Sequence, residues 1–112
     1  MQDNDEDAIL MAKNNLERQV IDVIYPFMTL DDGTEIVHSE MKDDGSVKVY
    51  IEKADAVDGF HNITCWLPRY EWKDNYGFKA EEIDRFKEIV QSTAHLIMRF
   101  AKEGGLEHAA SF

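Results

Sequence analysis

The sequence predicts a two-layer α+β domain with an N-terminal helix, a four-stranded antiparallel meander and a long C-terminal helix packed on one sheet face. Three observations predict it. Apolar residues recur at helical spacing near both ends of the chain, and residues 46–53 alternate strictly between apolar and polar. The tripeptide Asp-Asp-Gly occurs twice, twelve residues apart, as two consecutive hairpin turns would place it. At 112 residues, the chain is one domain, spanning 1–112.

The first predicted element is a helix over residues 3–24. Asp3, Asn4 and Asp5 can cap its start, since short polar side chains accept hydrogen bonds from the first helical amides. An apolar stripe with helical spacing follows, made by Ile9, Ala12, Leu16, Val20 and Ile24. Pro26 is expected to end this helix, because the residue before a proline is disfavoured in the helical region.

The meander is predicted over residues 27–67, with strands at 27–30, 34–42, 46–53 and 60–67. Val47, Val49 and Ile51 fall on one face of the third strand, and Lys48, Tyr50 and Glu52 on the other. In the fourth strand, Ile63, Cys65 and Leu67 are expected to face the core.

The C-terminal helix is predicted over residues 80–103, with acidic residues in its first turn and Gly104-Gly105 as its stop. Ile89, Leu96 and Phe100 widen its apolar stripe to about half of the circumference at ~100° per residue. One sheet face covers less than that, so we expect a second element on this helix. Either the N-terminal helix or a second copy of the chain fits, which makes these three residues self-association candidates. Residues 104–112 form a short tail.

The segment between sheet and helix, residues 68–79, is predicted to be an aromatic loop. With the adjoining Trp66, it contains five aromatic residues in thirteen positions. Trp, Tyr and Arg often anchor protein interfaces, because they bury a large area and also offer a polar group. Our candidate partner-binding residues are Trp66, Arg69, Tyr70, Trp72 and Tyr76. The alternative is that the aromatics close one end of the core, and both hold if Trp66 is core while Tyr70 and Trp72 face outward.

The charge distribution also indicates this aromatic segment as the candidate binding surface. The chain has 23 acidic and 12 basic residues, a net charge of -11, whereas residues 60–80 hold three basic and two acidic residues. An acidic surface repels phosphate groups, so direct binding of nucleic acid or membranes is disfavoured. A single cysteine and an N-terminus without a signal-like apolar run favour a cytoplasmic location.

No motif for catalysis, cofactor binding or a metal site is evident. The histidines His38, His61, His95 and His108 are scattered, and no paired ligand spacing of the zinc type is present. Cys65 with His61 or His38 is the one conceivable nucleophilic pair, but the strand phase places Cys65 inward, where a cysteine behaves as a small hydrophobe. We therefore predict no catalytic residue, no cofactor and no metal.

Three functional hypotheses follow. The first is a non-enzymatic domain that works by protein–protein contact. The second is an acidic inhibitor or nucleic-acid mimic that occupies a basic groove of a partner. The third is a small-molecule binder with residues 66–78 as a lid over a pocket.

Overall fold

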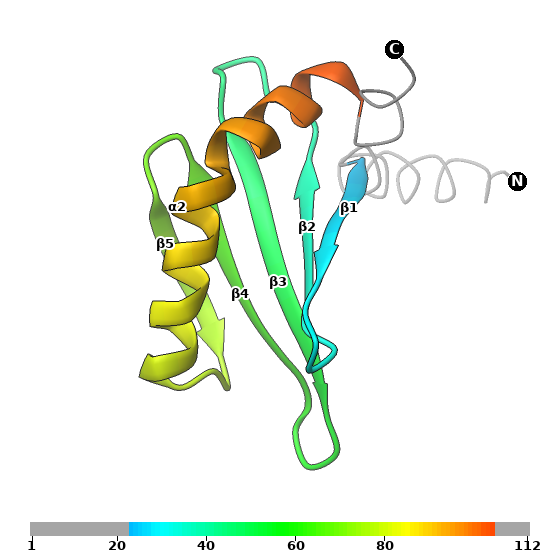
Figure 1. The fold of residues 1–112 in the computed structure, drawn as a ribbon, viewed down its shortest axis with the longest axis vertical. Coiled ribbons are helices and arrows are strands. Elements are labelled where there is room, and N and C mark those ends of the chain that lie inside the picture. The colour runs from blue at the N-terminus through cyan, green and yellow to red at the C-terminus, as the bar shows by residue number, and fades with distance from the viewer. Residues whose placement is uncertain (1–22, 105–112) are drawn as a thin grey trace, which may run out of the picture.

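The computed structural model describes residues 23–104, which form a five-stranded antiparallel sheet with one long helix across one of its faces (Figure 1). Neighbouring strands along the chain are also neighbours in the sheet, so the topology is a simple meander in the order β1-β2-β3-β4-β5. The strands are β1 (Ile24–Thr29), β2 (Glu35–Ser39), β3 (Val47–Asp55), β4 (Gly59–Leu67) and β5 (Glu71–Tyr76), and the helix is α2 (Ala80–Glu103). The α+β class is therefore confirmed.

The centre of the sheet follows the predicted alternation. β3 and β4 pair from Val47↔Leu67 to Asp55↔Gly59, nine residues on each side. Their inward-facing side chains are buried as expected, namely Val47, Val49, Ile51, Ile63, Cys65 and Leu67. Because side chains on a strand alternate between faces, the residues between them lie on the opposite face.

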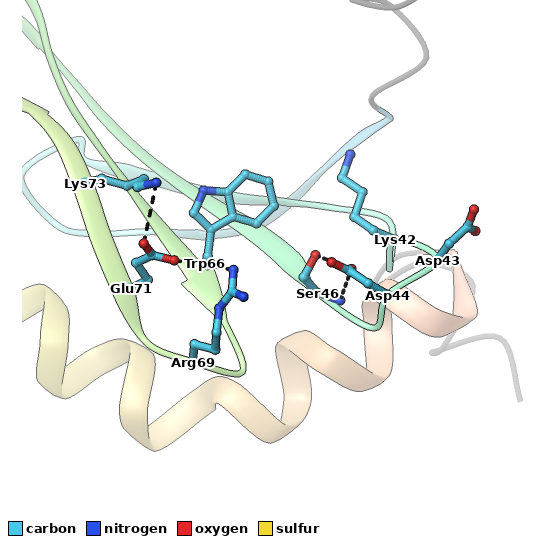
Figure 2. Close-up of a pocket in the computed structure, with 8 residues that line it drawn as sticks. All are labelled: Lys42, Asp43, Asp44, Ser46, Trp66, Arg69, Glu71 and Lys73. Atoms are coloured by element: carbon cyan, nitrogen blue, oxygen red, sulfur yellow. Dashed lines mark hydrogen bonds and ion pairs between the residues drawn. The ribbon is translucent and has the colours of Figure 1, made fainter.

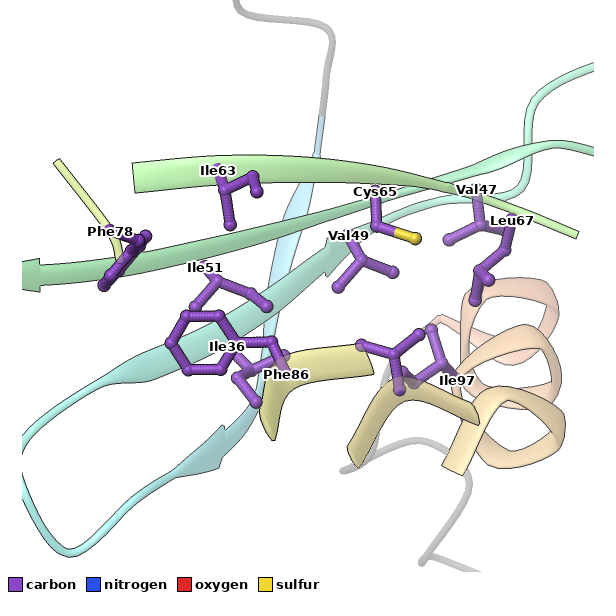
Figure 3. Packing of buried hydrophobic residues seen from close by; sticks show 12 residues of the cluster. Ile36, Val47, Val49, Ile51, Ile63, Cys65, Leu67, Phe78, Phe86 and Ile97 are labelled. Carbon is purple, nitrogen blue, oxygen red and sulfur yellow. The ribbon is translucent and has the colours of Figure 1, made fainter. Parts of the chain in front are cut away.

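The core lies between this face and α2 (Figure 3). The helix contributes Phe86, Val90, Ile97 and Ala101, and Phe78 closes the core at the start of the helix. The Phe78 and Phe86 rings meet edge to face with centroids 4.9 Å apart. Burial of each large apolar side chain of this kind stabilises the fold by about 1.5–3 kcal/mol.

The start of the sheet differs from the prediction. Ile24 begins β1, so the predicted helix does not extend to residue 24; its residues 3–22 lie outside the described part of the chain. Pro26 lies within β1 instead of ending a helix. A proline fits here because β1 is an edge strand, where a missing amide donor on the outer side leaves no ladder bond unmade. The pairing with β2 shifts register between Pro26 and Met28, which leaves Phe27 at a bulge.

The end of the sheet differs as well, because half of the predicted 68–79 loop is a fifth strand. β5 pairs with β4 at Cys65↔Trp72 and Trp66↔Glu71. Only a short turn, residues 68–70, separates the two strands. An edge strand has one neighbour and here one covered face, so it needs few apolar residues. In β5, Trp72 is the residue that packs against the core. The residues around it are polar, so the sequence of this strand resembles a loop.

The helix itself is confirmed over residues 80–103. The Glu82 carboxylate accepts a hydrogen bond from the Lys79 amide at 2.9 Å, and Gly104 ends the helix with φ 88°, a left-handed conformation that suits glycine. No helix of residues 23–104 is long and apolar enough to cross a membrane.

Part of the wide apolar arc of α2 packs within the described residues, and the expectation that a second element covers the rest stays a prediction. Phe100 is buried, with its ring 6.0 Å from that of Phe27 in β1. Ile89 is partly buried against the core. Of the three self-association candidates, Leu96 alone is not placed in or against this core. A dimer through α2 stays a prediction, and so does its alternative, the N-terminal helix, whose residues 3–22 lie outside the described part of the chain.

Candidate functional site

The face of the sheet opposite α2, called here the open face, carries several exposed or half-exposed aromatic side chains. No strand or helix among residues 23–104 lies across it (Figure 1). Register and alternation place four aromatic side chains on it, since Tyr50 pairs with Thr64 and Tyr76 with Asn62 on β4. Phe60 and Tyr76 are 53% and 54% exposed. The open-face aromatics are Tyr50, Phe60, Trp66 and Tyr76.

A shallow hollow of about 540 Å³ surrounds Trp66 at the end of this face where the β2–β3 turn comes closest to β4. Figure 2 shows the indole between Glu71 and Lys73 of β5 on one side and the turn residues on the other. The lining residues are Lys42, Asp43, Asp44, Ser46, Trp66, Arg69, Glu71 and Lys73. Trp66 is half-buried, so one side of its indole remains available to a bound group.

The lining of the hollow is electrically balanced. It holds three basic and three acidic side chains, within a chain of net charge -11. Glu71 bridges two of the cations, with Arg69 Nη2 at 3.4 Å from Oε1 and Lys73 Nζ at 3.5 Å from Oε2. These side chains are about half exposed, and exposed ion pairs contribute only about 0–1 kcal/mol. The pairs can therefore rearrange at little cost when a partner arrives.

One rim of the hollow is a rigid turn. Asp44 Oδ1 accepts hydrogen bonds from the Ser46 hydroxyl at 2.7 Å and from the Ser46 amide at 2.9 Å. These bonds lower the pKa of Asp44. Gly45 supplies the φ of 87° that the turn needs. The predicted second Asp-Asp-Gly turn is thus confirmed, and its geometry is fixed before anything binds.

The first Asp-Asp-Gly turn has the same construction. Asp32 accepts two bonds from Thr34, which lower its pKa to about 2, and Gly33 has φ 90°.

The five candidate partner-binding residues separate into two groups. Trp66 and Arg69 lie at the hollow, Tyr76 lies on the same open face, and Tyr70 is exposed in the turn before β5. Trp72 is placed on the opposite face, against the core. The arrangement in which Trp66 is core while Trp72 faces outward, considered above as one possibility, is the reverse of the one observed. Because β5 is a strand paired to β4, residues 66–78 do not form a lid loop.

Sequence reasoning missed the contribution of Tyr50, Phe60 and Lys42 to this face. The signal was available for Tyr50, because the alternation in β3 already placed it opposite the core. Lys42 could not be predicted, because it is far from Trp66 in the sequence and the folding of the β2–β3 connection brings the two together.

Cys65 has no features of a nucleophile. It is fully buried between Ile63 and Leu67, and burial raises the pKa of its thiol to about 12. His38 is also buried: its Nδ1 donates to the Ser39 carbonyl at 2.9 Å, and burial lowers its pKa. A thiol that stays protonated cannot attack a substrate at neutral pH.

His61 is the one histidine of the described residues that lies beside carboxylates, those of Asp55 and Asp58. The prediction that no metal-ligating group exists did not foresee this cluster, because the β3–β4 turn assembles it.

Known protein families, curated proteins and solved structures were compared with this chain, and none of them matched.

Proposed function

We propose that this chain is a non-enzymatic protein-interaction domain that binds a protein partner through the open face, with Trp66 at the centre of the contact. The observation that carries the proposal is a half-buried tryptophan in a charge-balanced hollow, on a sheet face without a covering element among the described residues. The residues that dominate binding at protein interfaces are enriched in Trp, Tyr and Arg, and Trp66, Arg69 and Tyr76 are of these types.

The construction of the site supports binding rather than chemistry. The sheet beneath it is supported from the other side, where the core packs against α2. The Arg69–Glu71–Lys73 group offers both signs of charge, which suits a polypeptide with charged side chains around an apolar one. No thiol or histidine of the described residues lines the hollow, and its one hydroxyl, that of Ser46, is buried and donates to Asp44 within the turn.

An affinity capture with three versions of the full chain tests the proposal. The baits are wild type, Trp66→Ala, and Lys87→Ala as a matched control on the exposed side of α2. We expect the principal captured protein to be lost with Trp66→Ala and retained with the control. Removal of a central aromatic anchor weakens binding by at least about 2 kcal/mol, roughly thirtyfold in Kd.

If Trp66→Ala folds normally and retains every partner of the wild type, the open face is not the binding site. The acidic-inhibitor hypothesis predicts a different pattern. Its partner is basic, its binding weakens with salt, and it is lost when Glu81, Asp84 and Glu88 on α2 become lysine while Trp66→Ala is tolerated.

A further inference from the structure

A second cluster of titratable side chains lies at the turn of the β3–β4 hairpin. It is on the same face of the sheet as α2, beyond the part that the helix covers. Asp55 ends β3, Asp58 lies in the turn, and His61 is the third residue of β4. Ligand atoms of these three side chains lie within 4.8 Å of one another. His61 Nε2 is 2.9 Å from Asp58 Oδ2 and 3.5 Å from Asp55 Oδ2.

Contacts outside the cluster fix the imidazole of His61. Its ring lies edge-on to Phe78 with centroids 5.6 Å apart, and only 14% of the side chain is exposed. On the other side, the backbone of Gly77 approaches so closely that a Cβ there would collide with the imidazole ring. The connection between β5 and α2 thus holds the ring, and Nε2 faces the two carboxylates.

The carboxylate of Asp55 is oriented by the backbone of the turn. Its Oδ1 accepts hydrogen bonds from the amides of Val57 at 2.8 Å and Asp58 at 3.0 Å. These bonds leave Oδ2 on the side of His61. Lys53, the cross-strand neighbour of His61, has its ammonium group 3.5 Å from Asp32.

We propose that Asp55, Asp58 and His61 bind a divalent transition-metal ion, of which Zn²⁺ is the probe. Zinc bonds to imidazole nitrogen and carboxylate oxygen are about 2.0–2.2 Å long, so adjacent ligand atoms lie about 3.3–3.6 Å apart around a tetrahedral ion. The 3.5 Å from Nε2 to Asp55 matches that separation, and the 2.9 Å to Asp58 would lengthen by about 0.4 Å as the ion enters. The ion replaces the proton between nitrogen and carboxylate, and water completes the coordination on the exposed side of Asp58.

The donor set determines the class of ion. One imidazole with two carboxylates favours Zn²⁺, Co²⁺ or Ni²⁺ over Mg²⁺ and Ca²⁺, which prefer oxygen ligands alone. The ion would join the end of β3, the turn and β4, and therefore stiffen the tip of the hairpin.

Titration calorimetry of the full chain with ZnCl₂ tests the proposal, with a fivefold excess of MgCl₂ present to occupy non-specific acidic sites. Expected are one Zn²⁺ per chain at this site and, with Co²⁺, visible absorption bands of an N/O-ligated ion. Asp58→Asn keeps the size of an exposed side chain and removes one ligand. His61→Gln removes the imidazole. Each is expected to weaken binding by more than about tenfold, since even outer-shell changes at metal sites cost that much.

His95→Gln is the matched control, because His95 is an exposed histidine on α2. It should leave affinity and stoichiometry at this site unchanged. The proposal is overturned if wild type binds no Zn²⁺ above the Mg²⁺ background. It is also overturned if Asp58→Asn, folded by circular dichroism, binds as tightly as wild type. Because Trp66 and the open face are untouched by these variants, the outcome is independent of the proposed function.

Discussion

Residues 65 and 66 of β4 are adjacent in sequence but belong to opposite faces of the sheet, and the two faces differ in almost every respect. Cys65 lies on the helix-covered face with its cross-strand partner Trp72, among side chains that exclude water. Trp66 lies on the open face with its partner Glu71, next to Arg69 and Lys73. The comparison teaches that aromatic content alone does not identify a binding surface. The face on which each ring lies decides whether it stabilises the fold or remains available to a partner.

The largest expected difference between the faces is in the free energy of unfolding. Phe86→Ala removes a buried ring that packs on Phe78, and we expect a loss of about 3–5 kcal/mol. Tyr50→Ala, the control on the open face, removes a half-exposed ring and should cost less than about 1.5 kcal/mol. Urea unfolding followed by circular dichroism measures both. Equal losses would show that the open face is part of a core.

The two tryptophans give the next largest expected difference between the faces in the free energy of unfolding. Trp72→Ala should destabilise the fold by about 2 kcal/mol, because a partly buried indole leaves the core. Trp66→Ala should cost about 1 kcal/mol or less and act on binding instead.

Single-tryptophan proteins check this placement directly. With Trp72→Phe, the remaining Trp66 should be quenched readily by acrylamide, and with Trp66→Phe, the remaining Trp72 should be protected. The placement is wrong if quenching is the same in both.

The smallest effect concerns pH and the buried His38 of the covered face. Its Nδ1 is bonded to the Ser39 carbonyl, and no donor among the described residues reaches Nε2. Burial lowers its pKa from 6.5, so below that pH the unfolded chain takes up a proton that the folded chain resists. The contribution of neutral His38 to the free energy of unfolding is therefore fully present above pH 6.5, and it is lost as the pH falls toward the pKa of the folded state.

Unfolding of wild type and His38→Leu between pH 5 and 8 measures this contribution. The variant should lose part of the slope of stability against pH, and His95→Gln, exposed on α2, should retain it. A slope that is unchanged in His38→Leu would assign the pH dependence to other groups.

Sequence patterns predicted the centre of the fold better than its edges. The alternation is clear in β3 and β4, over Val47–Ile51 and Ile63–Leu67. Each of these strands is paired on both sides and covered on one face. Burial of that face then requires an apolar residue at every second position. β1 and β5 are edge strands, with weaker demands. Pro26 is tolerated in one, and five of the six residues of the other are exposed, so neither shows a clear strand pattern.

The candidate sites show the same division. Trp66, Arg69 and Tyr76 were found from composition, because aromatic and basic residues stand out in an acidic chain. Lys42 and Asp44 beside Trp66, and the approach of Asp55 and Asp58 to His61, could not be found this way, since hairpin turns bring them together.

The sequence by itself determined the α+β class, the two Asp-Asp-Gly turns, the C-terminal helix over 80–103 and the inward side of the two central strands. These depend on local spacing and on turn chemistry, which are encoded within a few residues. Only the tertiary structure decided that Trp72 packs inward and Trp66 outward, and that Phe100 of α2 meets Phe27 of β1. Those outcomes depend on strand pairing: a fifth strand in register with β4 fixes the face of each of its side chains, and no local pattern in residues 71–76 specifies that register.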